Sequence, residues 1–189
     1  MARVLVTSGS ERRGSLNRKL ANVAAGLARA QGAEVTDLDL RALALPLYDG
    51  DVEAAGLPPG ALRLRDLFAA HDAVLIAAPE YNGFVTPLLI NAFAWVSRTP
   101  DGLAASGGTV AGLVSASPGY YGGARALIAL RSLLSMNLGL LVVPATHSIP
   151  QAGAAFDAAG ALVDAKQQAG VERVVRMVLK TADALKPAS

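Results

Sequence analysis

Two loops of this sequence carry residue types that together could hold a phosphate and a flat ring. The first loop, residues 9–17, reads Gly-Ser-Glu-Arg-Arg-Gly-Ser-Leu-Asn. A phosphate group needs several N–H or O–H donors and usually a cation, and the N-terminus of a helix adds free amides and a favourable dipole. A helix is expected to begin near Ser15, so its amides would point at the same place. The candidate phosphate-binding side chains are Ser10, Arg12, Ser15 and Asn17.

The first loop matches neither of two well-known phosphate-binding motifs. It lacks the Gly-Lys-Ser/Thr that follows four variable residues in the P-loop, and it lacks the Gly-x-Gly-x-x-Gly of dinucleotide-binding domains. Gly9 is expected to allow a tight turn after the preceding strand. The alternative interpretation is a polar loop in which Ser15 acts only as an ordinary helix cap.

The second loop, residues 79–83, places backbone amides and an aromatic side chain directly after an apolar run. Gly83 lets the main chain approach a flat ligand closely, and Tyr81 could stack on a ring or form a wall of its pocket. The alternative is a simple turn in which Asn82 and Gly83 supply the bend. The candidate ring-binding residues are Pro79, Glu80, Tyr81, Asn82 and Gly83.

A third loop, residues 115–123, follows another apolar run and precedes a helical pattern. It contains three glycines, the hydroxyls of Ser115 and Ser117, and the neighbouring Tyr120 and Tyr121. These residues suit the opposite edge of the same pocket, although a flexible strand-to-helix connection would have a similar composition. A phosphate site combined with a ring site indicates a mononucleotide cofactor.

The hydrophobic pattern predicts the elements that position these loops. Short apolar runs predict strands at residues 4–6, 34–38, 73–77, 109–115 and 140–143. Helical spacing predicts helices over 16–27, around 64–68, from the Thr-Pro pair at 86–87, over 124–137 and over 171–185. A loop rich in proline and glycine is expected at 45–60.

This alternation of strands and helices predicts an α/β fold, in which a parallel sheet is covered by helices on both faces. Residues 1–189 show no internal repeat and no linker, so they are expected to form a single domain. The three loops follow the first, third and fourth strands. In a doubly wound sheet they would meet at the carboxyl edge, where such sheets bind ligands.

Composition excludes several other classes of protein. The 189 residues are 52% hydrophobic and 17% charged, with a formal net charge of +2 and no cysteine. This weak, dispersed charge argues against nucleic-acid binding, and the lack of cysteine excludes disulfides and thiolate chemistry. No apolar run reaches the roughly 18 residues of a membrane span, and no signal peptide is visible, so a cytoplasmic protein is expected.

Histidines and serines give no pattern of a metal site or a covalent nucleophile. His71 lies at a predicted helix end, where a capping or surface role is expected. His147 follows the fifth strand and could reach the pocket rim, although nothing accompanies it that would make it a catalyst. The serines lack a nucleophile elbow, so no catalytic side chain and no metal ligand is predicted.

The helix that begins at 87 is apolar on more than one face. Its apolar residues are Leu88, Leu89, Phe93, Trp95 and Val96. Part of this set is expected to be core, and the excess predicts a subunit interface.

Taken together, these segments resemble the NADPH-dependent FMN reductase family, the flavodoxin-like group that includes chromate, quinone and azo reductases. The similar segments are Gly-Ser-x-Arg-x-x-Ser-x-Asn at 9–17, Pro-Leu-Tyr-Asp-Gly-Asp at 46–51, Pro-Glu-Tyr-Asn-Gly at 79–83 with Thr86-Pro87, Asn91-Ala92 and Trp95, Ser-x-Ser-Pro-Gly at 115–119 with Gly122, Gly123 and Arg125, and Phe156-Asp157 with Gly160 and Leu162. The resemblance covers nearly the whole chain. It implies a flavodoxin-like three-layer sandwich with strand order 2-1-3-4-5.

The resemblance also implies a cofactor and the residues that hold it. FMN would be bound, with NADPH or NADH as the co-substrate. Ser10, Arg12, Ser15 and Asn17 would hold the FMN phosphate, residues 79–83 would line the isoalloxazine ring, and Ser115 and Ser117 would contact the ring or the ribityl chain. The family further implies a homodimer or homotetramer. Two residues of the expected interface helix depart from the family pattern: Ile90 replaces a frequent lysine, and Ala94 replaces the usual aspartate.

The expected activity is that of an NAD(P)H-dependent reductase. Hydride would pass from the nicotinamide to flavin N5, and a small-molecule acceptor such as a quinone, azo dye, chromate, another metal oxyanion or free flavin would then take the electrons in a ping-pong cycle. One alternative is a flavin-binding electron carrier or regulatory module that does not oxidise NAD(P)H. Another is a nucleotide-binding enzyme that uses the first loop for a different phosphate.

Overall fold

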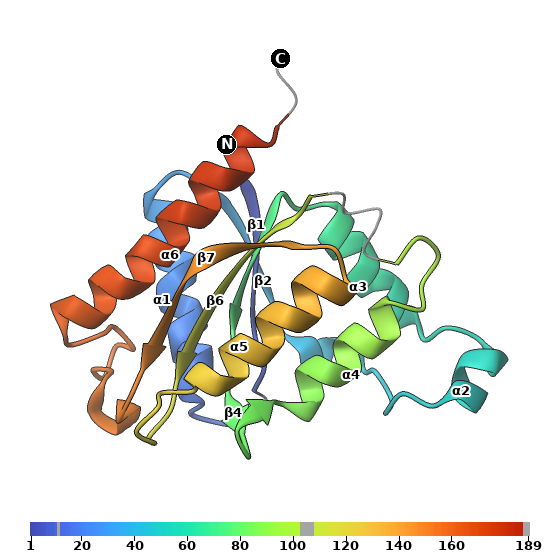
Figure 1. The fold of residues 1–189 in the computed structure, drawn as a ribbon, viewed down its shortest axis with the longest axis horizontal. Helices are drawn as coiled ribbons and strands as arrows, with labels where there is room; N and C mark the ends of the chain where they lie inside the picture. Colours follow the sequence, from blue (N-terminus) through green and yellow to red (C-terminus); the bar gives the residue numbers. More distant parts are fainter. Residues whose placement is uncertain (11, 103–107, 187–189) are drawn as a thin grey trace.

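The chain forms a three-layer α/β sandwich around one parallel sheet (Figure 1). The structure is a computed structural model that describes residues 1–10, 12–102 and 108–186. Five strands, all paired in parallel, lie in the order β2-β1-β3-β6-β7. They are β1 (Arg3–Ser8), β2 (Glu34–Leu38), β3 (Ala73–Ala77), β6 (Val110–Ala116) and β7 (Leu141–Ile149). Counted along the chain this is the order 2-1-3-4-5, so the flavodoxin-like prediction is confirmed.

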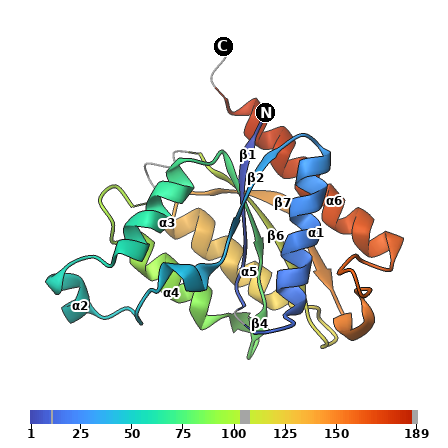
Figure 2. The same ribbon diagram turned by 180° about the vertical axis from the view of Figure 1, so that it is seen from behind.

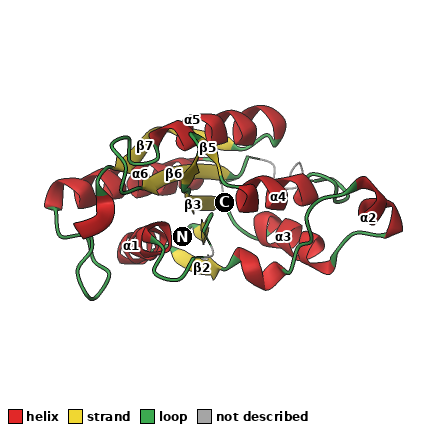
Figure 3. Cartoon of the chain, turned by 90° about the horizontal axis from the view of Figure 1, so that it is seen from below, coloured by secondary structure: helices red, strands yellow, loops and turns green. Residues whose placement is uncertain are grey.

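Helices cover both faces of the sheet (Figure 3). On one face α1 (Leu16–Ala30) and α6 (Ala165–Ala184) pack against side chains such as Val4, Val6 and Leu75. On the other face α3 (Pro59–Ala69), α4 (Pro87–Val96) and α5 (Ala124–Ser132) pack against Leu5, Val74 and Ile76. Alternate residues of one strand therefore enter two different cores. Strand β3 is buried throughout, as expected for a central strand with both faces covered.

The segment expected to be a loop at 45–60 contains a short helix, α2 (Gly50–Ala55). The carboxylate of Asp49 accepts a hydrogen bond from the amide of Asp51 and so caps this helix. No residue of α2 is buried, and the helix lies at the outer end of the molecule in both ribbon views (Figure 2). Because it buries no apolar face, it left no apolar periodicity from which it could be predicted.

One predicted boundary is wrong, and one predicted helix changes its winding before its predicted end. Strand β7 continues to Ile149, past Pro144, which the sequence pattern treated as its end. Proline is tolerated there because β7 is an edge strand, and the pairing with β6 is irregular between Ala111 and Leu113. The helix predicted over 124–137 ends at Ser132 and continues as one wider π-type turn over Leu133–Asn137.

The apolar excess of α4 has an explanation within the chain itself. Leu89, Phe93, Trp95 and Val96 are all buried, and the indole N–H of Trp95 donates to the carbonyl of Pro46 at 2.7 Å. The segment around Pro46 thus covers the face of α4 that the sheet leaves open. These four residues therefore belong to the core of the chain, Leu88 of the predicted set is half-buried, and the predicted subunit interface stays a prediction.

In the same way, the side chain of Asn91 fastens the 46–48 segment to α4. Its amide nitrogen donates to the carbonyl of Pro46 at 2.8 Å, and its oxygen accepts from the amide of Tyr48 at 2.7 Å. The motif at 46–51 and the Asn-Ala motif at 91–92 are thus parts of one contact. Within the described ranges, no helix is long and apolar enough to span a bilayer.

Candidate functional site

The loops that follow β1, β3 and β6 meet at the carboxyl edge of the sheet and enclose a cavity of about 200 Å³. Figure 1 shows this edge at the bottom of the molecule, next to β4 (Glu80–Tyr81). The cavity is lined by Ser10, Arg12, Ser15, Leu16, Asn17, Pro79, Glu80, Tyr81, Ala116, Ser117 and Pro118. Residues from all three predicted loops are therefore brought together. Asn82, Gly83 and Ser115, which were predicted with them, do not line this cavity.

The first loop supplies hydroxyls and free amides at the start of α1. The hydroxyl of Ser15 accepts a hydrogen bond from the amide of Arg18 at 3.2 Å, so Ser15 does cap the helix. The first backbone bond of the helix runs from Lys19 N to Ser15 O, which leaves the amides of Leu16 and Asn17 ahead of the helical ladder. The cap uses a lone pair of the Ser15 hydroxyl and leaves its proton free to donate. A cap and an anion-binding group are thus compatible roles for this residue.

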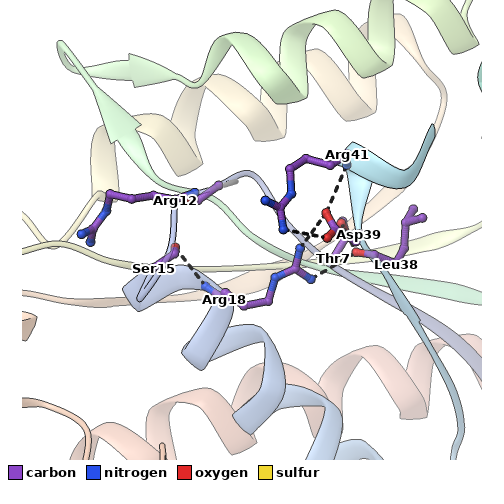
Figure 4. A network of polar contacts seen from close by, with 8 residues as sticks. Thr7, Arg12, Ser15, Arg18, Leu38, Asp39 and Arg41 are labelled. Atoms are coloured by element: carbon purple, nitrogen blue, oxygen red, sulfur yellow. Dashed lines mark hydrogen bonds and ion pairs between the residues drawn. The ribbon is translucent and has the colours of Figure 1, made fainter. Parts of the chain in front are cut away.

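Arg12 is the cation at the cavity. Its guanidinium is exposed, and among the described residues it takes part in no ion pair. By contrast, Arg18 and Arg41 both pair with Asp39, at 3.2 and 3.1 Å, and Figure 4 shows Arg12 lying apart from this cluster. Burial alone would raise the pKa of Asp39, but the hydrogen bonds and charges of Arg41 and Arg18 outweigh it and lower that pKa. Arg18 and Arg41 therefore both pair with Asp39, whereas Arg12 has no acidic partner among the described residues and is available to bind an anionic ligand.

Gly9 has a different role from the predicted tight turn. Its backbone is not in the left-handed region, and a Cβ placed on it would lie 2.7 Å from Cγ of Leu89 and 3.0 Å from Oγ1 of Thr86. The hydroxyl of Thr86 donates to the carbonyl of Gly9 at 2.9 Å and does not cap α4. Glycine is needed because the start of α4 packs directly on the first loop.

The second loop is a tight β-hairpin, formed by β4 (Glu80–Tyr81) and β5 (Phe84–Val85). Asn82 and Gly83 both have positive φ, at 53° and 79°, the conformation that two-residue hairpin turns require. The prediction that these two residues supply a bend is confirmed. The turn presents Tyr81, 51% exposed, at the rim of the cavity.

The carboxylate of Glu80 is directed at the first turn of α5. It accepts hydrogen bonds from the backbone amides of Arg125 at 3.0 Å and Ala126 at 3.3 Å, and from the guanidinium of Arg125. Burial would raise the pKa of Glu80, but these hydrogen bonds and the charge of Arg125 outweigh it and lower the pKa. Glu80 therefore stays ionised and structurally engaged, which makes it unsuitable as a general acid.

The two serines of the third loop have different surroundings. Ser117 lines the cavity, and its hydroxyl accepts from the amide of Gly119 at 3.1 Å. Ser115 is fully buried, and its hydroxyl donates to that of Ser148 at 3.0 Å. Alternation along a strand would place residues 115 and 117 on the same face, so the difference arises because β6 ends at Ala116 and Ser117 already belongs to the loop.

Sequence reasoning missed Leu16, Ala116 and Pro118 as lining residues. They have no chemical signal of their own, but each lies beside a residue that was selected. Asn17, predicted as a phosphate ligand, is buried and directs its side-chain amide at the backbone of Ala116.

Neither histidine belongs to the cavity. His71 bridges the carbonyl of Leu67 at 2.6 Å and the hydroxyl of Thr36 at 2.8 Å, which joins the end of α3 to β2. His147 bonds to the side chain of Gln167 at 2.8 Å and packs against Gly170 of α6. Both are structural contacts. Across residues 1–10, 12–102 and 108–186, no group of three or more acidic, histidine or cysteine side chains could hold a metal.

The lining of this cavity fits a phosphorylated flat molecule. Two nearly buried hydroxyls, Ser10 and Ser15, stand with the guanidinium of Arg12 and the amides of Leu16 and Asn17 on one side. Pro79, Tyr81 and Pro118 form apolar or aromatic walls on the other. The cavity is smaller than the roughly 300–1,000 Å³ of typical cofactor sites, so a mononucleotide would fill it and extend over the rim toward Tyr81.

Comparison with known proteins gives matches along most of the chain. A family model described as NADPH-dependent FMN reductase matches residues 2–154. An NAD(P)H-dependent FMN reductase of Pseudomonas aeruginosa is 39% identical over 166 residues, 87% of this chain and 86% of the relative. A quinone reductase of Pseudomonas putida is 37% identical over 183 residues, 93% of this chain and 94% of the relative. Among solved structures, the flavoenzyme NAD(P)H:(acceptor) oxidoreductase FerB of Paracoccus denitrificans superposes with a TM-score of 0.80 at 32% identity, covering 96% of this chain and 99% of that one.

Proposed function

Since the chain belongs to the NADPH-dependent FMN reductase family, we propose that it passes electrons from NAD(P)H to a quinone in a ping-pong cycle. Membership makes the protein an oxidoreductase that uses FMN as its cofactor and NAD(P)H as its co-substrate, as the sequence motifs predicted. The ping-pong order and the quinone acceptor are proposals that go beyond family membership.

The observation that carries the proposal is the division of the cavity into an anion-binding side and an aromatic side. Ser10, Arg12 and Ser15 would hold the phosphate of FMN, with the amides at the start of α1. Pro79, Tyr81 and Ser117 would contact the ring and the ribityl chain. When bound, FMN supplies the hydride and electron chemistry, which agrees with a cavity in which Glu80, the one carboxylate among the described lining residues, is engaged with α5.

The remaining predicted residues would act on the shape of the loops. Asn82 and Gly83 form the hairpin turn that presents Tyr81, and Glu80 fixes the hairpin against α5. Ser115 holds β6 to β7 through Ser148. None of these residues needs to touch the flavin in order to matter for its binding.

Exposed aromatic side chains favour a flat acceptor. Tyr81 is 51% exposed at the rim, and Phe84 and Tyr121 in the adjoining segments are exposed as well. Aromatic faces stack well on planar rings, and several relatives are named quinone reductases. A single site that takes NAD(P)H and quinone in turn requires one to leave before the other enters, which is why a ping-pong order is proposed.

Anaerobic titration of the FMN-loaded protein tests the reductive half of the cycle. NADPH or NADH should bleach the flavin absorbance, and added quinone should restore it without any nucleotide present. Steady-state double-reciprocal plots should be parallel. A flavin that no nicotinamide bleaches would indicate an electron carrier, and a protein that takes up no flavin would indicate another phosphate ligand. Faster reoxidation by azo dye, chromate or free flavin than by quinone would contradict the proposed acceptor.

Assembly and location are further parts of the proposal. The family resemblance supports a homodimer or homotetramer, and the exposed Phe84, Tyr120 and Tyr121 offer apolar surface for such a contact. Light scattering during size-exclusion chromatography distinguishes these assemblies from a monomer. We propose a cytoplasmic location, where NAD(P)H is supplied, and cell fractionation tests it.

A further inference from the structure

Asn17 is a polar residue on the buried face of a helix. It is the second residue of α1, and the helix continues this face with Leu20, Ala21 and Ala24 against the sheet. Asn17 itself is 4% exposed. A buried side-chain amide needs hydrogen-bond partners, because leaving its groups unpaired costs free energy.

The partner is the backbone of Ala116, the last residue of β6 and 99 residues away in the sequence. The nitrogen of the Asn17 amide donates to the Ala116 carbonyl at 2.8 Å, and its oxygen accepts from the Ala116 amide at 3.0 Å. One side chain thus satisfies both backbone groups of one residue, as a neighbouring strand would.

The sheet explains why Ala116 needs this contact. Pairing of β3 with β6 ends at Ala77 and Val114, with one further bond from the amide of Ala78 to the Val114 carbonyl. Backbone groups of alternate residues face the same neighbouring strand, so after Ala78 the next residue turned toward β6 would be Glu80, which belongs to the β4–β5 hairpin and pairs with Val85. The amide of Ser117 points the other way, to Ile149 of β7, so Ala116 faces the side on which β3 has ended.

We propose that Asn17 is a positioning residue, which acts on the flavin site through Ala116 and is not a ligand of the phosphate. This inference rests on the proposed function and differs from the role that the family resemblance implies. Asn17 follows Ser15 on the anion-binding side, and Ala116 precedes Ser117 and Pro118 on the opposite wall. The amide of Asn17 therefore sets the separation of the two walls.

Riboflavin, which is FMN without its phosphate, separates the two roles. Removing a phosphate ligand weakens the binding of FMN and leaves that of riboflavin nearly unchanged. Loss of a positioning residue weakens both to the same extent. We expect Asn17→Ala to reduce apoprotein affinity for both flavins by about tenfold, measured by fluorescence quenching. Arg12→Ala is the matched control, expected to affect FMN far more than riboflavin.

Hydrogen exchange in the apoprotein tests the contact without any flavin. The amide of Ala116 should exchange at least about tenfold faster in Asn17→Ala than in wild type, while amides in the middle of β1 and β3 keep their protection. Asn17→Asp retains an acceptor for this amide and should restore much of the protection. Protection of the amides in the middle of β1 and β3 shows whether each variant has folded.

Two results would overturn the proposal. One is a loss of FMN affinity in Asn17→Ala with riboflavin affinity intact, which would make Asn17 a phosphate ligand. The other is unchanged exchange of the Ala116 amide, which would remove the contact itself. If wild-type protein bound neither flavin, the proposed function would fail, while the exchange measurement would still decide whether Asn17 holds Ala116.

Discussion

The carboxylate of Glu80 lies across the N-terminus of α5 and accepts hydrogen bonds from both the backbone amide and the guanidinium Nε of Arg125, at 3.0 and 2.8 Å. The N-cap position of this helix is Gly123, which has no side chain to fill that place. A residue of the second loop therefore caps the helix that follows the third loop. With the contacts of Asn17 to Ala116 and of Thr86 to Gly9, it joins all three loops around the cavity.

We expect Glu80→Gln to lower the stability of the apoprotein. The glutamine keeps one acceptor, but in either orientation its NH₂ group would face donors, either the helix amides or the guanidinium of Arg125, and the charge would be lost. A cost of about 1.5 kcal/mol would lower the thermal midpoint by about 3–6 °C. Calorimetry measures it. The control is Glu172→Gln, which removes an exposed pair with Arg176 on α6 and should change the midpoint by less than half as much. Equal shifts of the thermal midpoint in the two variants would show that capping by Glu80 adds no more stability than an exposed ion pair.

The stability contributed by Glu80 should depend on pH in a defined direction. Its pKa in the folded protein is lower than the usual 4.5, so the folded state binds this proton less readily than the unfolded chain. The contribution is therefore fully present above about pH 4.5 and is lost as the pH falls through the lowered pKa. Denaturant unfolding at a series of pH values should give free energies of unfolding for wild type and Glu80→Gln that converge in acid. If the difference in free energy of unfolding between the two proteins widened in acid, the stabilising role of the ionised Glu80 would be refuted.

Arg12 and its neighbour Arg13 should differ sharply in FMN binding. Both are exposed, but only Arg12 lines the cavity. Arg12→Ala should weaken FMN binding by about 1.5–3 kcal/mol, the range of a charged hydrogen bond, while Arg13→Ala should leave it nearly unchanged. Isothermal titration of apoprotein with FMN gives both values. Similar losses in the two variants would mean that only the general positive charge of the loop matters.

Gly9 and Gly26 provide a comparison of two glycine-to-alanine changes. Gly9→Ala would place a methyl group against Leu89 and push the first loop away from α4, so both stability and FMN affinity should fall, with a stability loss of about 1–3 kcal/mol. Gly26 is exposed within α1 with nothing near its Cβ position, so Gly26→Ala should stabilise the protein by up to about 1 kcal/mol. Unfolding curves check the stability changes, and a tolerated Gly9→Ala would show that the contact with Leu89 is loose.

Local patterns were sufficient where the structure depends on neighbours in the sequence. The apolar run at 73–77 and the repeat of Leu16, Leu20 and Leu27 report burial on one strand and one helix, and both elements are present. Asn82-Gly83 carried its turn conformation in its residue types, since positive φ is accessible to few others. Prediction from the sequence failed at α2, which has no buried residue, and at the end of β7, where an edge position tolerates Pro144.

The sequence by itself determined the fold, the family and the three loops that make the cavity, because strand runs and turn residues are short-range signals. Only the tertiary structure decided which side chains of those loops turn inward to the cavity and which serve the framework. Asn17, Glu80 and Ser115 are paired with groups 99, 45 or 33 residues away. Such partners exist because strands end at different points and a helix begins at a glycine, which leaves backbone groups that a distant side chain must satisfy.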